Sequence, residues 1–207
     1  MQMQLKDLGR GFSQPALCSQ SVFRHALGAL SRPASLQILE AAGALQGMQP
    51  PQGAHPAAAA LLLALLDQDC KLWLSAGFMH SDAAAWLRFH TGCAVVSDLV
   101  EADFAWVAVA SELPPLSSFS QGSAEYPDQS ATCIVQVDGL QTPAPALAWA
   151  LSGPGVKGSA QLQVDGLGAE FLAQRRASQL HFPCGVDFLL THGQTFVGLP
   201  RSTQIQG

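Results

Sequence analysis

The stretch that most constrains the fold is residues 185–205, in which apolar side chains alternate on both sides of a short polar turn. Val186, Phe188 and Leu190 share one face, because successive side chains of a strand point to opposite faces of a sheet. The dipeptide at 192–193, His-Gly, stands where a two-residue turn is expected, with glycine supplying a positive φ. The stretch therefore predicts a β-hairpin with a polar tip and a polar tail.

An arginine and two hydroxyls follow this hairpin. Pro200 has no N–H to donate, so it ends the second strand, and Arg201, Ser202 and Thr203 come next. The planar fork of arginine matches a phosphate or carboxylate, and free backbone N–H groups favour anions as well. Two interpretations remain open, an oxyanion cradle or an edge strand that ends in a solvated arginine.

Composition favours one domain over residues 1–207, in which residues 1–14 show no clear period and form a loose arm. With 48% hydrophobic residues the chain can build a core, but only 12% are charged. An average soluble domain has roughly 25% charged residues. A surface so poor in charge predicts a permanent partner or an oligomer.

Several classes of protein are excluded by the same numbers. The net charge is −5, and the only lysines are Lys6, Lys71 and Lys157, so we expect no nucleic-acid partner. The longest apolar run, residues 56–66, is shorter than the about 20 residues that span a bilayer. The N-terminus lacks a signal pattern, and the five cysteines are widely spaced and odd in number. We expect a cytoplasmic protein with reduced thiols and no membrane partner.

Helical periods dominate the first half of the chain and strand periods the second. A helix is expected at 15–30, another from 56 that is apolar all round and therefore buried or at an interface, a third at 82–90, and a fourth at 168–179. Inward-facing side chains are expected at Val22, Phe23, Ala26, Leu27 and Leu30 of the first helix and at Trp86 and Phe89 of the third. Strands are expected at 34–40, 71–75, 94–97, 104–110, 131–137, 146–152 and 159–164. This order predicts an α/β layered domain with a mixed β-sheet flanked by helices.

Common catalytic patterns are incomplete. Residues 153–158 match G-x-G-x-x-G, but residues 159–164 alternate like a strand, so a hairpin connection is favoured over a dinucleotide site. None of the lysines has a convincing context for pyridoxal phosphate (PLP), and no G-x-S-x-G elbow is present. His181 and Cys184 are three residues apart, but one such pair is a weak metal signal. We therefore expect no cofactor, no metal and no readable catalytic residue.

Arginines with polar neighbours in the sequence remain as candidates for ligand binding. They are Arg24, Arg88 with His90, and Arg201 with Ser202 and Thr203. If these side chains converge, they form an anion pocket. If they do not, they are solvated or capping residues, since a helix dipole favours cations near its C-terminal end, where Arg88 and His90 lie.

Particular segments carry a resemblance to a known family. They are Phe23-Arg24 through Ser31-Arg32-Pro33, LLLALLDQDCKLWL at 61–74, LRFHTG at 87–92, LSGPG at 151–155, Phe182-Pro183 with GVDFLL at 185–190, and LPRST at 199–203. The chain resembles PhnH, a subunit of the bacterial carbon–phosphorus lyase core complex. Ser202 replaces a threonine expected after the arginine, which keeps the hydroxyl, and Ala94 replaces a frequent proline.

The resemblance implies a fold similar to PLP-dependent transferases that does not use PLP. It implies a homodimer when isolated, and association with the G, I and J subunits in the complex. The implied reaction of the complex joins ATP and an alkylphosphonate into a ribose 1-phosphonate 5-triphosphate and releases adenine. The chain is then an accessory subunit that does not catalyse alone; the alternative is an anion-binding module that holds a phosphate or phosphonate ester, and an independent enzyme is the third hypothesis.

Overall fold

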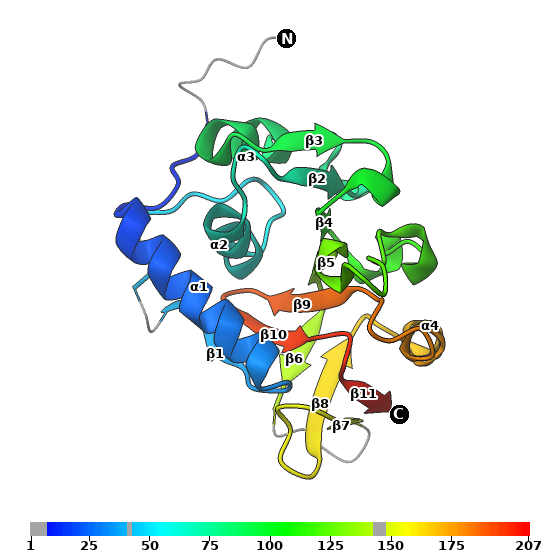
Figure 1. The fold of residues 1–207 in the computed structure, drawn as a ribbon. Coiled ribbons are helices and arrows are strands. Elements are labelled where there is room, and N and C mark those ends of the chain that lie inside the picture. Colours follow the sequence, from blue (N-terminus) through cyan, green and yellow to red (C-terminus); the bar gives the residue numbers. More distant parts are fainter. Residues whose placement is uncertain (1–7, 41–42, 143–147) are drawn as a thin grey trace.

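The computed structural model describes residues 8–40, 43–142 and 148–207. Its centre is a seven-stranded mixed sheet in the order β1-β10-β9-β5-β4-β2-β3 (Figure 1). These strands are β1 (Gln37–Ile38), β2 (Lys71–Leu74), β3 (Ala94–Val96), β4 (Phe104–Val107), β5 (Thr132–Gln136), β9 (Asp187–His192) and β10 (Thr195–Leu199). The run from β9 to β3 is parallel, whereas β10 and β1 pair antiparallel. The predicted mixed sheet flanked by helices is confirmed, and the likeness to PLP-dependent transferases stays a prediction.

Helices cover one face of this sheet, and a second sheet with one helix covers the other. The first face carries α1 (Pro15–Ser31), α2 (Pro56–Leu65) and α3 (Ala83–Thr91). The second face carries α4 (Ala169–Gln179) and a four-stranded sheet in the order β11-β7-β8-β6. Its strands are β6 (Gly139–Gln141), β7 (Trp149–Ser152), β8 (Ala160–Asp165) and β11 (Gln204–Gln206). Short 3-10 helices are η3 (Ala76–Phe78), η4 (Leu99–Glu101), η5 (Ala110–Glu112), η6 (Leu116–Ser118) and η7 (Pro127–Gln129).

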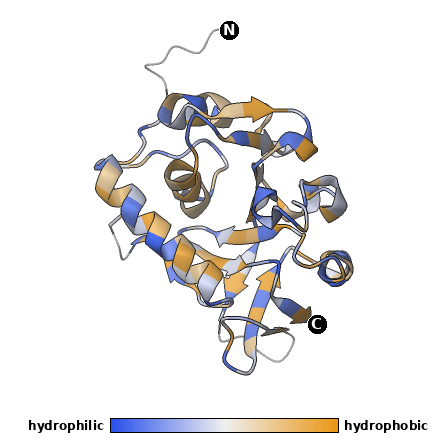
Figure 2. Ribbon diagram, viewed as in Figure 1, coloured by the Kyte–Doolittle hydropathy of each residue, from blue (hydrophilic) through white to orange (hydrophobic). Residues whose placement is uncertain are grey.

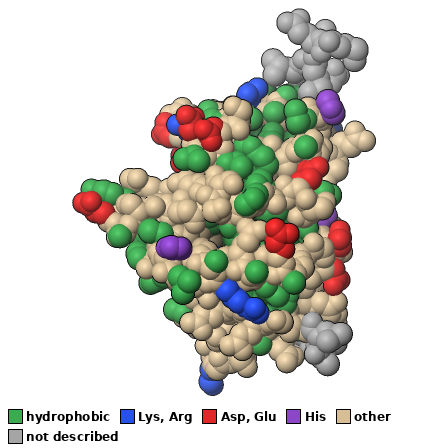
Figure 3. Space-filling view, turned by 90° about the vertical axis from the view of Figure 1, so that its right-hand side faces the viewer, with side chains coloured by type: hydrophobic (Ala, Val, Ile, Leu, Met, Phe, Trp, Pro, Cys, Tyr) green, Lys and Arg blue, Asp and Glu red, His purple; other side chains and the backbone are tan. Residues whose placement is uncertain are grey.

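Strand alternation divides the interior into two cores. Ile134 and Leu189 pack with the three N-terminal helices, while Val135 and Leu190 pack towards α4 and the second sheet. Both faces of the central strands are thus buried, as expected for parallel strands covered on each side. On the face on which α4 lies, charged side chains are scattered among apolar and neutral ones (Figure 3).

The apolar helix α2 is an interior helix rather than an exposed interface. Residues Ala57 to Leu62 are all fully buried, and the helix is apolar along its length (Figure 2). Its neighbours are α1, α3 and the central strands. None of the described helices is both long and apolar enough to cross a membrane.

Two predicted inward faces are corrected. On α1 the buried residues include Val22 and Ala26, whereas Phe23 and Leu27 are 45% and 53% exposed. On α3, Phe89 is 56% exposed. Gly198 on β10 and Ala29 on α1 are small, which lets the helix lie close to the strand. The side of α1 that contacts the sheet is therefore the side with short side chains, and the larger side chains face outward.

Strand limits differ from the prediction where pairing, rather than local pattern, decides. The loop between β9 and β10 consists of Gly193 and Gln194, because His192 still pairs with Thr195. Gly193 has the expected positive φ of 56°. The strand predicted at 34–40 shrinks to β1, and the part of the predicted 146–152 strand before residue 148 lies outside the described residues.

Three further points concern the second sheet and the N-terminal segment. The glycine-rich segment 153–158 joins the antiparallel strands β7 and β8, so the hairpin interpretation is confirmed. Strands β6 and β11 were not predicted. Of the predicted N-terminal arm, residues 1–7 lie outside the described residues, and Gly9 is bonded to α3.

Candidate functional site

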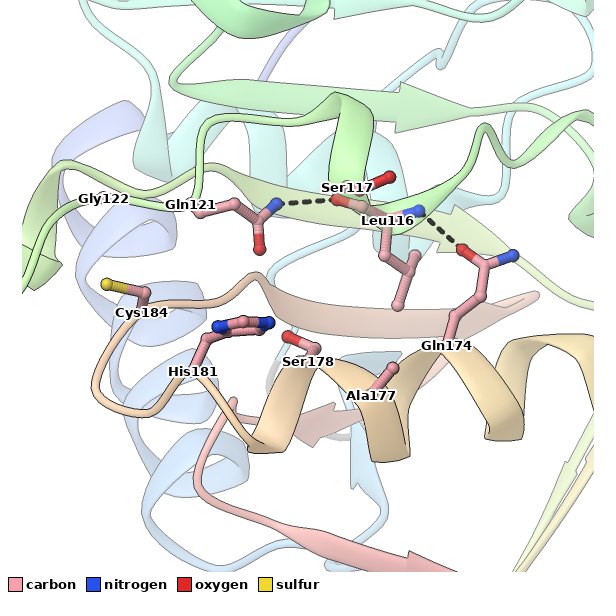
Figure 4. Close-up of a pocket in the computed structure, with 9 residues that line it drawn as sticks. All are labelled: Leu116, Ser117, Gln121, Gly122, Gln174, Ala177, Ser178, His181 and Cys184. Carbon is pink, nitrogen blue, oxygen red and sulfur yellow. Dashed lines mark hydrogen bonds between the residues drawn. The ribbon is translucent and has the colours of Figure 1, made fainter.

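A pocket of about 510 Å³ lies between the segment that begins with η6 and the C-terminal half of α4 (Figure 4). The pocket lining contains two amides, two hydroxyls, an imidazole and a thiol besides apolar groups. The lining residues are Leu116, Ser117, Gln121, Gly122, Gln174, Ala177, Ser178, His181 and Cys184.

Hydrogen bonds with two side-chain amides hold the first wall of the pocket, residues 116–122, in place. The Leu116 N–H donates to Gln174 Oε1 at 2.7 Å, which ties η6 to α4. Gln121 Nε2 donates to the carbonyls of Leu116 and Phe119 at 2.6 and 2.9 Å. Because both donor positions of this amide are occupied by the protein, its Oε1 is the atom turned towards the open pocket (Figure 4).

The opposite wall is the end of α4 and the turn after it. Ala177 and Ser178 lie on the last turns of the helix, and His181 and Cys184 follow, joined by a backbone bond of 2.9 Å. The Gly185 N–H then donates to the Gln121 carbonyl at 2.9 Å. This bond connects the two walls directly.

Gly185 is required at this junction for two reasons. Its φ is +141°, and a Cβ there would lie 3.2 Å from Ser178 Oγ and 3.3 Å from Arg201 Cβ. An L side chain rarely adopts this backbone conformation, and the space behind it is already filled by Arg201. The geometry of this wall thus depends on a residue without a side chain.

Arg201 bonds to the protein's own oxygen atoms. Its Nη2 lies 2.6 Å from Asp187 Oδ2, its Nε and backbone N–H both donate to Asp187 Oδ1, and its Nη1 donates to the Pro127 carbonyl. Asp187 and Arg201 are 20% and 17% exposed, so the pair is largely covered. An external anion at Arg201 would have to share or displace Asp187.

The remaining predicted residues lie on other elements. Arg24 is exposed on α1 and Arg88 is exposed on α3, while His90 Nε2 bonds to the Gly9 carbonyl at 3.0 Å. Ser202 is half-buried, and Thr203 is buried with Oγ1 lacking a hydrogen-bond partner among the described residues. None of the six predicted residues lines the pocket, and the structure does not gather them around it.

Arg175 is the residue that the sequence analysis missed. Its side chain is 2% exposed and donates to the carbonyls of Val186, Pro200 and Thr203 at 2.9, 2.8 and 3.3 Å. Its guanidinium carbon lies 5.5 Å from the Phe188 ring centre, within the range of a cation–π contact. Burial lowers the pKa of Arg175 to about 10, so it is still a cation at neutral pH.

A signal for Arg175 exists in the sequence. It follows Phe171 by four residues and Leu172 by three, and both are buried, so helical spacing places it on the apolar face of α4. The arginine holds α4, and with it one wall of the pocket, to Val186, which precedes β9, and to the turn before β11.

A histidine pair at the carboxyl end of the central strands is a second polar cluster. His55 Nδ1 bonds to the Thr191 carbonyl at 2.9 Å, and His192 Nδ1 bonds to the Val137 carbonyl at 3.2 Å. The two rings meet edge to face, with centres 5.7 Å apart. Burial lowers the pKa of His55, and the bond to Thr191 only partly opposes this.

The chemistry that the pocket can perform is limited by its residue types. Among the residues that the structure describes, no carboxylate, lysine or arginine lines it. Within the described ranges, no group of three or more His, Cys, Asp or Glu side chains could hold a metal ion. The arrangement is suited to hold a ligand by hydrogen bonds and apolar contact.

Three segments that carry the resemblance to PhnH are joined by close backbone contacts. A Cβ on Gly155 would collide with the Ser31 carbonyl, and one on Gly153 would lie 2.9 Å from the Ser202 carbonyl. The loop at 152–155 therefore contacts both the turn at 31–33 and the turn at 200–203, although the three segments are far apart in the sequence.

Comparison with known proteins agrees with these segments. A family model described as "Bacterial phosphonate metabolism protein (PhnH)" matches residues 10–206. The Rhizobium meliloti (strain 1021) protein "Alpha-D-ribose 1-methylphosphonate 5-triphosphate synthase subunit PhnH" is 34% identical over 195 residues, 94% of each chain. A "Putative C-P lyase subunit protein HtxG" of Stutzerimonas stutzeri is 31% identical over 186 residues, 90% of this chain and 85% of its own. The chain belongs to the PhnH family of bacterial phosphonate metabolism proteins.

Proposed function

We propose that the chain is an accessory subunit of the carbon–phosphorus lyase core complex and does not catalyse a reaction alone. The complex would convert ATP and an alkylphosphonate to a ribose 1-phosphonate 5-triphosphate and adenine. One observation carries this proposal: the Rhizobium meliloti relative, which is named as a subunit of such a synthase, aligns with 94% of this chain.

The surroundings of Asp187, Arg201 and Cys133 support an accessory role. Acid–base catalysis needs a titratable group that can reach a substrate, and nucleophilic catalysis needs an activated nucleophile beside a base. Asp187 and Arg201 are bonded to each other, and the thiol of Cys133 is fully buried with a raised pKa. Neither arrangement leaves a free reactive group.

The outer side of α1 supports a role in assembly. Leu17, Phe23 and Leu27 are exposed on this helix, along which hydrophobic and hydrophilic residues are interspersed (Figure 2). Ile38 of the neighbouring strand β1 is 49% exposed. Phe23 and Leu27 are four residues apart and therefore lie on the same side of the helix. Exposed apolar side chains that lie together are typical of protein contact sites. We propose that the chain is a cytoplasmic homodimer when isolated and joins the G, I and J subunits in the complex.

Co-purification tests the assembly role. Leu27→Glu places a charge on an exposed apolar position of α1, and Gln20→Glu places the same charge on an exposed polar position of the same helix. We expect Leu27→Glu to weaken dimerisation or capture of the G, I and J subunits at least tenfold, and Gln20→Glu to have little effect. Unchanged assembly of Leu27→Glu would reject α1 as the contact surface, and turnover of a phosphonate or nucleotide by the isolated chain would reject the accessory role.

A phosphate- or phosphonate-binding role at Arg201, Ser202 and Thr203 is the second candidate. The buried hydroxyl of Thr203 without a hydrogen-bond partner among the described residues is the observation that favours it. We expect methylphosphonate to raise the melting temperature of the wild type and not that of Thr203→Val, because a ligand of the native state stabilises it by mass action. No shift with the wild type would leave this candidate without support.

A further inference from the structure

The pocket beside α4 is formed before any ligand arrives. Its volume of about 510 Å³ is within the roughly 300–1,000 Å³ common for small-molecule sites. Its walls are tied together by protein bonds, from Leu116 to Gln174 at 2.7 Å and from Gly185 to Gln121 at 2.9 Å. A preformed site loses little conformational entropy on binding, which favours affinity for a small rigid molecule.

One polar atom in the pocket has a fixed hydrogen-bonding role. Gln121 Nε2 donates to two carbonyls, and the reversed amide would place an oxygen against both, so the orientation is determined by its partners. Oε1 receives no hydrogen bond from the described residues and points into the pocket (Figure 4). It can only accept, so the ligand group opposite it must be an N–H or O–H donor.

The other side chains define the rest of the ligand. Leu116 approaches from the η6 wall, and Ala177, Ser178 and His181 face it from α4 and the following turn (Figure 4). Imidazole rings stack on flat heterocycles, and the serine hydroxyl can donate or accept. Since none of the described lining residues is a lysine or arginine, a phosphate or phosphonate group would find no permanent cation among them.

We propose that this pocket binds an uncharged planar heterocycle of the nucleobase class. One N–H of the ring or its amino group donates to Gln121 Oε1, and the ring face lies against His181 and the apolar side chain of Leu116. The site is separate from the Arg201 turn and does not depend on whether the chain joins a complex.

Titration calorimetry with adenine as the probe tests this proposal. We expect adenine to bind the wild type and raise its melting temperature, and methylphosphonate and ribose 5-phosphate not to compete. Ala177→Phe fills the pocket from an exposed helix position, whereas Ala173→Phe adds the same ring one turn earlier, outside the pocket. Adenine affinity should fall at least tenfold in Ala177→Phe and stay within twofold in Ala173→Phe.

Thiol labelling gives an independent readout in the unmodified protein. Cys184 lines the pocket and is partly exposed, while Cys70 is partly exposed elsewhere and serves as the internal reference. Saturating adenine should slow alkylation of Cys184 several-fold and leave Cys70 unchanged, as quantified by mass spectrometry of the two peptides.

Three results would overturn the proposal. The first is absence of any adenine effect on melting, heat and Cys184 labelling. The second is protection of Cys184 by methylphosphonate in place of adenine. The third is an Ala177→Phe variant that keeps adenine binding but no longer captures the other subunits, which would make the pocket a contact surface for a protein chain.

Discussion

Replacing Arg175 with leucine should destabilise the protein far more than the same change at the next residue. Arg175 is buried and makes two short charge-assisted bonds, to Val186 O at 2.9 Å and to Pro200 O at 2.8 Å. Each such bond contributes about 1.5–3 kcal/mol. Leucine recovers part of the sum, because a buried guanidinium carries a desolvation cost that an apolar side chain does not.

The net loss should therefore be about 2–4 kcal/mol. In the leucine variant the Pro200 carbonyl still accepts from the Thr203 N–H, and the Thr203 carbonyl still accepts from Gln179 Nε2. The Val186 carbonyl is therefore the acceptor most affected by loss of the Arg175 hydrogen bonds. For a chain of this size, about 3 °C of melting temperature corresponds to each kcal/mol, which predicts a fall of roughly 6–12 °C.

Arg176→Leu is the matched control, because Arg176 is exposed and its one hydrogen bond to a described residue goes to the Gly207 carbonyl at 3.1 Å. Its effect should stay within about 0.5 kcal/mol. Arg175→Lys should fall between the two, since an ammonium keeps the charge but not the planar fork. Urea unfolding at pH 7 measures all three, and equal midpoints for the two leucine variants would refute the role assigned to Arg175.

Three further predictions concern packing, the ion pair and pH. Gly198→Ala should lower the free energy of unfolding in urea by about 1–3 kcal/mol, because the new Cβ would lie 2.6 Å from the Ala29 carbonyl carbon. The control Gly168→Ala, whose Cβ would have nothing within 4 Å, should change it by no more than about 0.5 kcal/mol. Equal effects of the two substitutions would contradict the close packing of α1. Asp187→Asn should lower the free energy of unfolding by about 1–3 kcal/mol, because it removes the carboxylate that accepts three hydrogen bonds. A melting temperature unchanged by this substitution would show that the ion pair is neutral for stability. In the folded chain the pKa of His55 is below its ordinary 6.5, so its contribution to stability is complete above pH 6.5 and is lost as the pH falls from there towards the folded pKa. His55→Asn should therefore lessen the fall in melting temperature between pH 7.5 and about 5.5. An identical fall in the wild type and the variant would contradict this prediction.

Local pattern was sufficient for the elements whose side chains alternate over several residues. The hairpin of β9 and β10, and the strand β5, were predicted within a residue or two, because each has enough apolar positions to define a period. The glycine-rich segment at 153–158 was also recognised as a hairpin connection, since the residues after it alternate. These features depend on neighbours in the sequence.

Elements that depend on distant partners were not predicted. Strand β11 has three residues and exists because it pairs with β7, and β6 exists because it pairs with β8. The burial of α1 was misjudged for a related reason. Gly198 on β10 admits the backbone of α1 at Ala29, and no property of the helix itself reveals that its partner strand has a glycine there.

The candidate site shows the same division between local and distant information. Arg201 was recognised by its neighbours in the sequence, but its partners Asp187 and Pro127 are 14 and 74 residues away, and they occupy its donors. The pocket depends on Gln121, which lies between β4 and β5 at a position where no helix or strand was predicted. Its role became visible only when its amide was found between two carbonyls.

The PRST turn and the FPxGVD segment are therefore best explained as supports of the α4 pocket. Arg201 fills the space behind Gly185, and Gly185 joins the two walls through the Gln121 carbonyl. Arg175 holds α4 to the carbonyls of Val186 and Pro200 in the same two segments. A substitution in either segment would shift one wall relative to the other without touching a ligand. Loss of function at Arg201 consequently does not identify it as a ligand contact, and binding must be measured together with stability to separate the two roles.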